Sequence, residues 1–472
     1  MGKKEQRLLK LAQLIYEKKP KEISLSQLAN ELEMSGKMLA ESIYEYQSLN
    51  LKTCGLKIEI KDSQKVTSQT HEFSFNKLKQ VLIKRSLNFK LCQKIFAGEF
   101  TSVFDFSEEH YISIASMYRH VKELKKLLEK YYLTLNLSQA PLIKGQEYHI
   151  RHFYFELYFA AYGLTEGYLA KNKWQVAIHE ESLLETALPV RQKIRLLYYI
   201  SLSRLSQNNY MSEIAYLKPY KSLILEEKLT TFYINHLKKT GASQEQIISE
   251  LNFFLIYTLK IGIFDSEELA KIDLLVSENS KEFNEEICWV HQWIEVFLRF
   301  FDIKLSVEMH LFLSVNLYIH FISKTFFPYS MVDFKDVLLK YQKEDPYIWK
   351  RTLLFKSQLK KQYPQIMLSD YLTHFFVREV MSLTKEEIDV CLFSSCSHSQ
   401  SSIIEREIKK RTTTQIKISR KITKKTKLIV SDLDFDLTKI NSHNRPERVF
   451  IQTVPSESDY QLIIKMILKL SQ

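Results

Sequence analysis

The sequence predicts a mainly helical protein of several domains, with helix-turn-helix units near its N-terminus and a small α/β domain at its C-terminal end. At 472 residues, the chain is too long for a single hydrophobic core. It contains only nine glycines and nine prolines, so turns are sparse and helices should dominate. Hydrophobic residues recur mostly at helical spacing up to Thr384, and short apolar runs typical of buried strands follow.

The net charge of +12 is concentrated at the two ends of the chain. Residues 1–150 hold 24 basic and 17 acidic side chains, residues 151–380 hold 27 of each, and residues 381–472 hold 16 basic and 11 acidic. A basic N-terminal third is the expected footprint of a module that binds a polyanion such as nucleic acid. The alternative is an uneven surface charge without consequence for binding.

We expect the chain to reside in the cytoplasm and not in a membrane. Its five cysteines are odd in number, scattered and without a CxxC pair, which favours a reducing compartment. The first residues, 1–7, have no apolar signal-peptide core. No run of about 18 apolar residues predicts a membrane span.

The first candidate DNA-binding unit is a helix-turn-helix. Ser24 and Gln27 have the spacing of a capping box that opens a helix over 25–32. Ser35 can cap the next helix after a short turn, and this order of helix, turn and helix defines the motif. The residues expected to contact DNA from this second helix are Ser35, Lys37 and Ser42.

A β hairpin is expected to follow this unit. Residues 56–61 alternate hydrophobic and charged side chains, which is the pattern of a half-buried strand. Asp62 and Ser63 would turn the chain back toward Val66. The hairpin is therefore a candidate wing, with Lys57 and Lys61 available for DNA phosphates.

A second helix-turn-helix is centred on residues 105–131. Ser107 is expected to cap a short helix, with Glu108 and Glu109 in its first turn, and Ser113 is expected to cap the next helix. Five hydrophobic residues then recur at helical spacing and predict one buried stripe: Ile114, Tyr118, Val121, Leu124 and Leu128.

The opposite face of that helix is polar and mostly basic, which suits the major groove of DNA. The alternative is an ordinary amphipathic helix with a solvated charged face. The exposed face of the earlier helix carries Glu41 and Glu45, which would repel phosphates, so we expect the later helix to contribute more contacts. Its candidate DNA-binding residues are Ser113, Ser116, Arg119, His120, Lys122 and Lys126.

The segment after this helix carries a family resemblance. Gly145 is expected at the tip of a hairpin, and Gly145-Gln146-Glu147 is followed by Ile150-Arg151 and an aromatic-rich helix. This pattern, after two helix-turn-helix units, resembles the end of the DNA-binding half of the Mga/RofA/AtxA group. These are stand-alone virulence transcription regulators of Gram-positive bacteria. The resemblance covers the whole chain and is strongest over 1–165.

The resemblance implies five domains. Residues 1–70 would form a winged helix-turn-helix, and residues 71–164 a second helix-turn-helix. Residues 165–278 and 279–384 would form two helical bundles similar to the regulation domains that the sugar phosphotransferase system (PTS) phosphorylates on histidine. Residues 385–472 would form a small α/β domain that resembles enzyme IIB of that system.

No motif in the middle of the chain indicates catalysis. It contains no phosphate-binding loop, no HExxH spacing and no Ser/His/Asp signature, so we expect no enzyme activity, no catalytic residues, no cofactor and no metal. In the resembling family, the first regulation domain tends to carry a histidine a few residues after an arginine. Here Arg204 is followed by Asn208 and Asn209 instead. His374, near the end of the second bundle, is the candidate phosphorylation site.

The C-terminal domain is expected to be a scaffold. A short strand over 388–393 is followed by Cys396, which occupies the place of the phosphorylated cysteine of active enzyme IIB domains. Such loops use glycine to close around phosphate, whereas this one has Ser397, Ser399 and Ser401. Cys396 is therefore a candidate thiol site without a predicted phosphoryl-transfer role, and the domain is expected to join two subunits.

The sequence thus predicts a transcription regulator that binds double-stranded promoter DNA. The resemblance implies an activator of virulence or surface-protein genes, a homodimer formed through the C-terminal domain, and modulation by PTS phosphotransfer proteins. One alternative is a PTS-linked phosphocarrier enzyme that relays phosphate through His374 and Cys396. Another is an RNA-binding antiterminator, although the RNA-binding modules of those proteins are small β structures.

Overall fold

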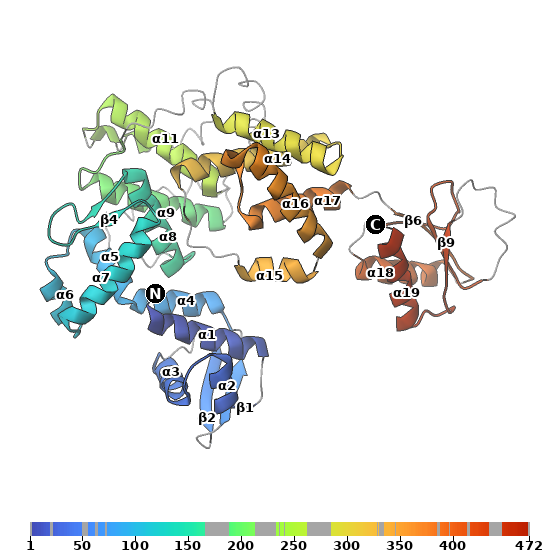
Figure 1. The fold of residues 1–472 in the computed structure, drawn as a ribbon, viewed down its shortest axis with the longest axis horizontal. Helices are drawn as coiled ribbons and strands as arrows, with labels where there is room; N and C mark the ends of the chain where they lie inside the picture. The colour runs from blue at the N-terminus through green and yellow to red at the C-terminus, as the bar shows by residue number, and fades with distance from the viewer. Residues whose placement is uncertain are drawn as a thin grey trace. The chain divides into compact units, whose positions relative to one another are not determined.

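The computed structural model shows a mainly helical chain that divides into two compact units (Figure 1). The first unit comprises Met1–Cys288 with Val315–Asp333, and the second comprises Trp289–Ser314 with Phe334–Gln472. The predicted helical fold class is confirmed, while the division into five domains stays a prediction. The structure describes residues 2–18, 22–49, 55–61, 65–70, 73–165, 188–212, 233–235, 237–239, 241–261, 285–327, 329, 335–344, 346–384, 388–395, 397–412, 416–433 and 446–470.

The N-terminal part of the first unit is a helix-turn-helix with a β hairpin. The predicted caps are confirmed: the hydroxyl of Ser24 accepts a hydrogen bond from the amide of Gln27 at 3.1 Å, and Ser35 accepts one from Met38 at 3.2 Å. Leu39 and Ile43 lie in one hydrophobic core with residues of the flanking helices and strands. The elements are α1 (Lys3–Lys18), β1 (Ile23–Ser24), α2 (Leu25–Glu31), α3 (Gly36–Ser48), β2 (Leu56–Lys61), β3 (Lys65–Thr70) and α4 (Phe75–Arg85).

The three strands form an antiparallel sheet in the order β1-β3-β2. The hairpin of β2 and β3 was predicted from alternation, whereas β1 was not. Two residues are too few to show a strand period, so β1 is defined only by its pairing, in which Ile23 lies opposite Val66.

The second helix-turn-helix follows directly, and one predicted cap is wrong. The first helix of this motif is capped by Ser102, whose hydroxyl accepts from the amide of Asp105 at 3.0 Å. Ser107 is buried inside that helix and donates its hydroxyl to the carbonyl of Val103. A serine within a helix can bond back to the preceding turn, so serine alone does not mark a helix start. The elements are α5 (Leu87–Ala97), α6 (Val103–Glu109), α7 (Ile114–Glu129), β4 (Thr134–Leu135), β5 (Ile143–Lys144) and α8 (Glu147–Tyr162).

The buried stripe of α7 also differs from the prediction. Ile114 and Tyr118 are 45% and 58% exposed. Met117, which lies between these two residues in the sequence, is buried instead. Both sets match helical spacing to the shared residues, so periodicity cannot choose between them, and the packing partner decides. The observed stripe is Met117, Val121, Leu124 and Leu128.

Gly145 lies after β5 and not at the tip of the hairpin as predicted. A β carbon at this position would come within 2.5 Å of Cδ2 of Leu133 and 3.0 Å of the carbonyl oxygen of Tyr132. Glycine is therefore required for the close approach of the chain just before α8 begins.

A buried network of charges connects α8 to α9 (Leu188–Leu205) and α11 (Gln244–Ile261). Arg151 of α8 is fully buried and donates two hydrogen bonds to the carboxylate of Glu250 in α11, at 2.6 and 2.8 Å. It donates a third to Glu147 at 3.0 Å. Arg204 of α9 binds the same Glu147 at 2.8 and 2.9 Å. Two arginines and two glutamates therefore link three helices.

The carboxylate of Glu250 is fully satisfied. It also accepts the hydroxyl of Tyr233 at 2.8 Å and the backbone amide of Met211 at 2.9 Å. The Nη2 atom of Arg151, which donates to Glu250, also donates to the carbonyl of Asn209 at 3.1 Å. Burial alone would lower the pKa of Arg151, but Glu250 and Glu147 raise it above its ordinary value, so the arginine stays charged.

His152 is another buried polar residue of α8. Its Nε2 lies 2.8 Å from the carbonyl oxygen of Tyr329, which can only accept, so Nε2 carries the proton. Its Nδ1 therefore accepts the hydroxyl of Tyr257 at 2.9 Å. Burial, assisted by the charge of Lys260, lowers the pKa of His152 to about 3. The imidazole is neutral at physiological pH.

The second unit contains an aromatic core and the C-terminal sheet. The indole of Trp293 packs against the rings of Phe355 and Phe376, with centroids 5.2 and 5.9 Å apart. The helices described over 285–384 are α13 (Glu285–Phe301), α14 (Val307–Phe326), α15 (Lys335–Glu344), α16 (Pro346–Gln362), the short 3-10 helix η5 (Pro364–Ile366) and α17 (Asp370–Thr384).

The C-terminal α/β arrangement predicted from the sequence is observed. Four parallel strands lie in the order β7-β6-β8-β9, and the core side chains of the sheet pack with those of the two helices. The first helix begins at His398, where Ser397 and Gln400 form a capping box. The elements are β6 (Ile388–Phe393), α18 (His398–Arg411), β7 (Ile416–Ser419), β8 (Leu428–Ser431), β9 (Glu447–Phe450) and α19 (Glu457–Leu470).

Among the described helices, none combines the length and the apolar character needed to cross a bilayer.

We expect Glu250→Gln to destabilise the first unit by about 3–5 kcal/mol, because it leaves the buried charge of Arg151 without its main partner. Hydrogen exchange of the α8 amides measures the free energy of opening. The matched control is Glu22→Gln, which removes an exposed pair with Lys65 at 3.1 Å and should cost no more than about 1 kcal/mol. Equal effects of the two changes would show that the network does not hold α8.

Acid should weaken the same unit through His152. A histidine in an unfolded chain has a pKa of about 6.5. Below that pH the unfolded chain therefore binds a proton at this position, whereas His152 in the folded protein stays unprotonated until the pH approaches 3. The contribution of neutral His152 to the free energy of unfolding is therefore complete above about pH 6.5. It is lost as the pH falls toward 3, and the free energy of unfolding decreases by ~1.4 kcal/mol per pH unit in this range. Urea unfolding of His152→Gln should show lower stability at neutral pH and a pH slope smaller by about one proton. An unchanged slope would contradict the assignment.

Candidate nucleic-acid interface

The exposed face of α7 is cationic. Ser113 caps the helix, its hydroxyl accepting from the amide of Ser116 at 3.2 Å. Arg119, Lys122 and Lys126 follow on the solvent side and are exposed. Within the described part of the chain, none of these three cations forms an ion pair. Their charges are therefore available to phosphates or bases.

His120 and Ser116 are less open than predicted. Both are partly buried. A β carbon on Gly2 would lie 3.8 Å from Cε1 of His120, which places the imidazole beside the start of the chain and away from the Arg119 face. The backbone amide of Ser116 donates to the cap hydroxyl of Ser113.

The exposed face of α3 differs in charge. Lys37 is exposed, and Ser35 is engaged as the cap. Ser42 is buried, and its hydroxyl donates to the carbonyl of Met38 at 2.7 Å, so we leave Ser42 out of the interface. Glu41 is exposed, and Glu45 pairs with Lys4 at 2.7 Å. This helix presents as much negative as positive charge.

The lysines of the hairpin are exposed, but two of them have acidic partners. Lys57 lies 2.6 Å from Glu59, and Lys65 lies 3.1 Å from Glu22. Lys61 forms no ion pair with the residues that the structure describes. Exposed pairs are weak, so phosphate could displace the carboxylates at little cost.

His374 is not on the surface. It is fully buried in α17, where Nδ1 lies 3.2 Å from the hydroxyl of Thr352. The rings of Tyr341 and Trp349 pack against it, with centroids 4.9 and 5.3 Å away. A phosphoryl donor would reach this imidazole only after the packing around it opens.

Cys396 lies outside the described residues, but its neighbour is informative. The backbone amide of Ser395 donates to one oxygen of Asp432 at 2.8 Å, and its hydroxyl donates to the other at 2.5 Å. Burial raises the pKa of Asp432, but these hydrogen bonds lower it, and the net shift is below its ordinary value. A carboxylate therefore occupies a loop amide that a phosphate would need.

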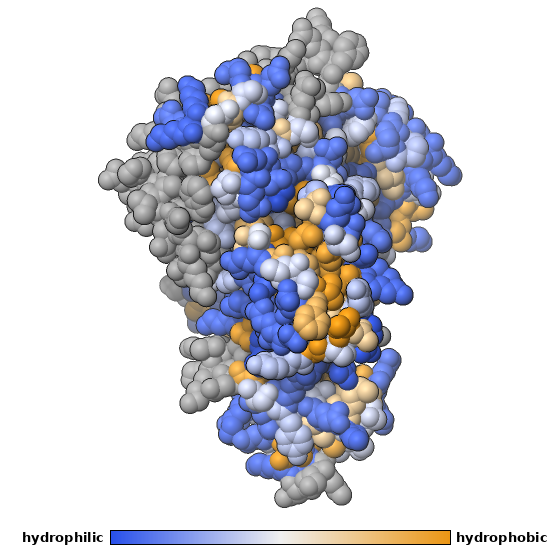
Figure 2. All heavy atoms as spheres, turned by 90° about the vertical axis from the view of Figure 1, so that its left-hand side faces the viewer, coloured by the Kyte–Doolittle hydropathy of each residue, from blue (hydrophilic) through white to orange (hydrophobic). Residues whose placement is uncertain are grey.

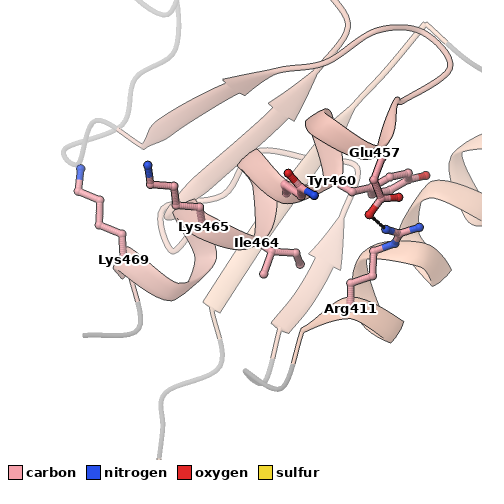
Figure 3. Close-up of a pocket in the computed structure, with 7 residues that line it drawn as sticks. Arg411, Glu457, Tyr460, Ile464, Lys465 and Lys469 are labelled. Atoms are coloured by element: carbon pink, nitrogen blue, oxygen red, sulfur yellow. Dashed lines mark hydrogen bonds and ion pairs between the residues drawn. The ribbon is translucent and has the colours of Figure 1, made fainter. Parts of the chain in front are cut away.

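A pocket lies on the C-terminal domain, beside α18 and α19 (Figure 3). The guanidinium of Arg411 stands 4.5 Å from the ring of Tyr460 and binds Glu457 at 2.5 Å. Ile464 lines the apolar part, and Lys465 and Lys469 line one end. Its charges are largely paired, so it does not resemble a catalytic site. Among the described residues, no group of histidine, cysteine and acidic side chains could hold a metal ion.

Sequence reasoning missed two kinds of residue. Ile114 and Tyr118 are exposed on α7 although their spacing predicted burial. Arg151 and Glu250 are fully buried, although charged residues are rarely buried in proteins. The sequence signals the importance of Arg151 only through the family motif that contains it.

Residues 71–158 match the Mga helix-turn-helix domain. The chain is also similar to the "Capsule synthesis positive regulator AcpB" of Bacillus anthracis, with 24% identity over 245 residues, which are 50% of this chain and 48% of that protein.

A second relative is the "Putative trans-acting regulator" of Streptococcus pneumoniae serotype 4 (strain ATCC BAA-334 / TIGR4). The identity is 23% over 224 residues, which are 45% of this chain and 43% of the relative. The matched region thus spans about half the length of each curated relative. The resemblance inferred from the sequence is confirmed: residues 71–158, which include α7, match the Mga helix-turn-helix domain, and the chain is similar to two proteins named as regulators.

Proposed function

We propose that this protein is a transcription regulator that binds double-stranded promoter DNA through α7. The observation that carries the proposal is the row of exposed cations Arg119, Lys122 and Lys126 on the second helix of a helix-turn-helix. That helix enters the major groove in proteins of this kind, with its first residues on base edges. Lys37 and the hairpin lysines supply weaker contacts to phosphates.

Activation and a cytoplasmic location are part of the proposal. The B. anthracis relative is named a positive regulator of capsule synthesis, which favours activation of surface or virulence genes. Binding of chromosomal promoters requires the cytoplasm. Control by PTS phosphotransfer proteins would act on His374, and its burial requires that α16 and α17 separate for phosphorylation.

The C-terminal domain is proposed to join two copies of the chain. Leu462 on α19 is 45% exposed. It lies on a different face of this helix from Tyr460 and Ile464, which line the pocket (Figure 3). Dimerisation would place two α7 helices on two half-sites of DNA. A phosphocarrier role gains no support, because Asp432 holds the Ser395 amide. An RNA antiterminator gains none either, since the N-terminal part is helical.

DNA binding should depend steeply on salt, with log affinity falling by about 0.9 per phosphate neutralised for each unit of log salt. Arg119→Ala should weaken binding by roughly 1–3 kcal/mol if the guanidinium contacts a base. The matched control is Glu41→Ala on α3, which should leave affinity unchanged or slightly higher. Fluorescence anisotropy with promoter duplexes measures both. A flat salt response, or equal behaviour of the two variants, would remove the proposal.

Leu462→Lys should shift the protein toward monomer, because it places a charge in the proposed apolar interface next to Lys465. DNA affinity should fall as well, since the two half-sites are no longer held together. Sedimentation velocity of the full chain is the measurement. Leu354→Lys is the control, since Leu354 is 51% exposed on α16, outside the C-terminal domain. A dimer that persists in Leu462→Lys, and also in a chain ended at Thr384, would place the interface elsewhere.

A further inference from the structure

The first two turns of α7 carry hydrophobic side chains that the fold does not use. Ile114 is 45% exposed and Tyr118 is 58% exposed, and Ala115 between them is exposed too. The core side of the helix is already filled by the stripe that starts at Met117, which is 1% exposed. Single exposed hydrophobic residues are common, but here three lie together at the start of one helix.

Their position on the helix is that of base-contacting residues. At about 100° per residue, Ile114, Ala115, Tyr118 and Arg119 fall within an arc of about 140°. The recognition helix of a helix-turn-helix uses its N-terminal residues to contact base edges. Figure 2 views the molecule from the side on which α6 and α7 are drawn at the left of Figure 1, and hydrophobic side chains are exposed there among hydrophilic ones.

The surrounding charge selects nucleic acid as the occupant. Arg119, Lys122 and Lys126 continue the same exposed face, and they form no ion pair within the described residues. Glu123 and Glu129 are also exposed on α7, but the exposed cations of the helix outnumber them. A protein partner for this apolar surface would need acidic groups to match those cations, whereas DNA supplies phosphates on both sides of an apolar feature. That feature is the 5-methyl group of thymine, the one apolar group on the edges of the bases in the major groove.

We propose that Ile114 and Tyr118 recognise thymine through contact with its 5-methyl group. The inference rests on the proposed function and adds the chemistry of sequence selection. The cations on α7 hold the DNA backbone, Arg119 is placed for a guanine or a phosphate, and the apolar pair distinguishes thymine from cytosine. A target should therefore carry thymines at fixed positions in each half-site.

Uracil substitution tests this directly, because it removes the methyl group and keeps base pairing. A duplex is first selected by the full-length protein from a random-sequence library, and is then made with thymine or with uracil. Wild-type protein should bind the uracil duplex about fourfold more weakly for each methyl group contacted. Ile114→Ser and Tyr118→Ser should each bind the thymine duplex more weakly and should reduce the thymine-to-uracil ratio, and the double variant should bring it to about one.

Two further variants serve as controls. Tyr118→Phe keeps the apolar ring and should keep the thymine-to-uracil ratio of the wild type. Tyr347→Ser removes an aromatic ring of similar exposure, 66%, from α16 and should change nothing. A wild-type ratio of one, or a ratio that persists in the double variant, overturns thymine recognition while DNA binding stands. Failure to enrich any duplex from the library overturns both this inference and the proposed function.

Discussion

The position of α8 depends on one buried charge, the guanidinium of Arg151. An uncompensated charge in a protein interior costs several kcal/mol, so the fold is stable only where Glu147, Glu250 and the carbonyl of Asn209 surround it. These partners come from α8 itself, from α11 and from the turn after α9. A slide of one helical turn in any of the three would separate donors from acceptors. Hydrophobic packing tolerates such slides better, so the network fixes the register of the helices in a way that apolar contacts do not.

Aromatic residues of α8 close to this network pack against the helix-turn-helix domain. The ring of Tyr154 packs on Phe96 of α5 with centroids 4.5 Å apart, and its hydroxyl reaches the carbonyl of Cys92. Helix α5 in turn packs against α7. The same helix therefore contacts both the charged network and α5, which supports the proposed DNA-binding helix. A change in the packing of α9 can reach α5 through α8 or directly, because the ring of Tyr199 in α9 lies 5.9 Å from that of Phe96.

Local signals predicted more of the fold than patterns of burial did. Ser24, Ser35 and Ser113 were predicted as caps because the geometry involves only three or four consecutive residues. The buried face of α7 was predicted wrongly because Tyr118 and Met117 both suit helical spacing, and the choice belongs to residues distant in sequence. The same distinction holds for the candidate site. The cations of α7 were predicted from the local sequence, whereas the burial of Ser42 and His374 depends on tertiary packing, which a local sequence pattern does not reveal.

The two helix-turn-helix units illustrate why exposure matters more than residue type for a binding helix. Both second helices begin after a serine cap and carry a basic residue in their first two turns. On α3 the exposed positions include Glu41 beside the apolar Met38 and Tyr44, and Glu45 pairs with Lys4, so the net field toward a phosphate is weak. On α7 the exposed neighbours are mostly apolar or basic. Glu123 and Glu129 are acidic, but neither forms an ion pair with these cations among the described residues. An apolar surface costs nothing to desolvate when a base edge covers it, whereas an acidic one must lose its water and meet a like charge. The difference between the helices therefore arises from what surrounds each cation.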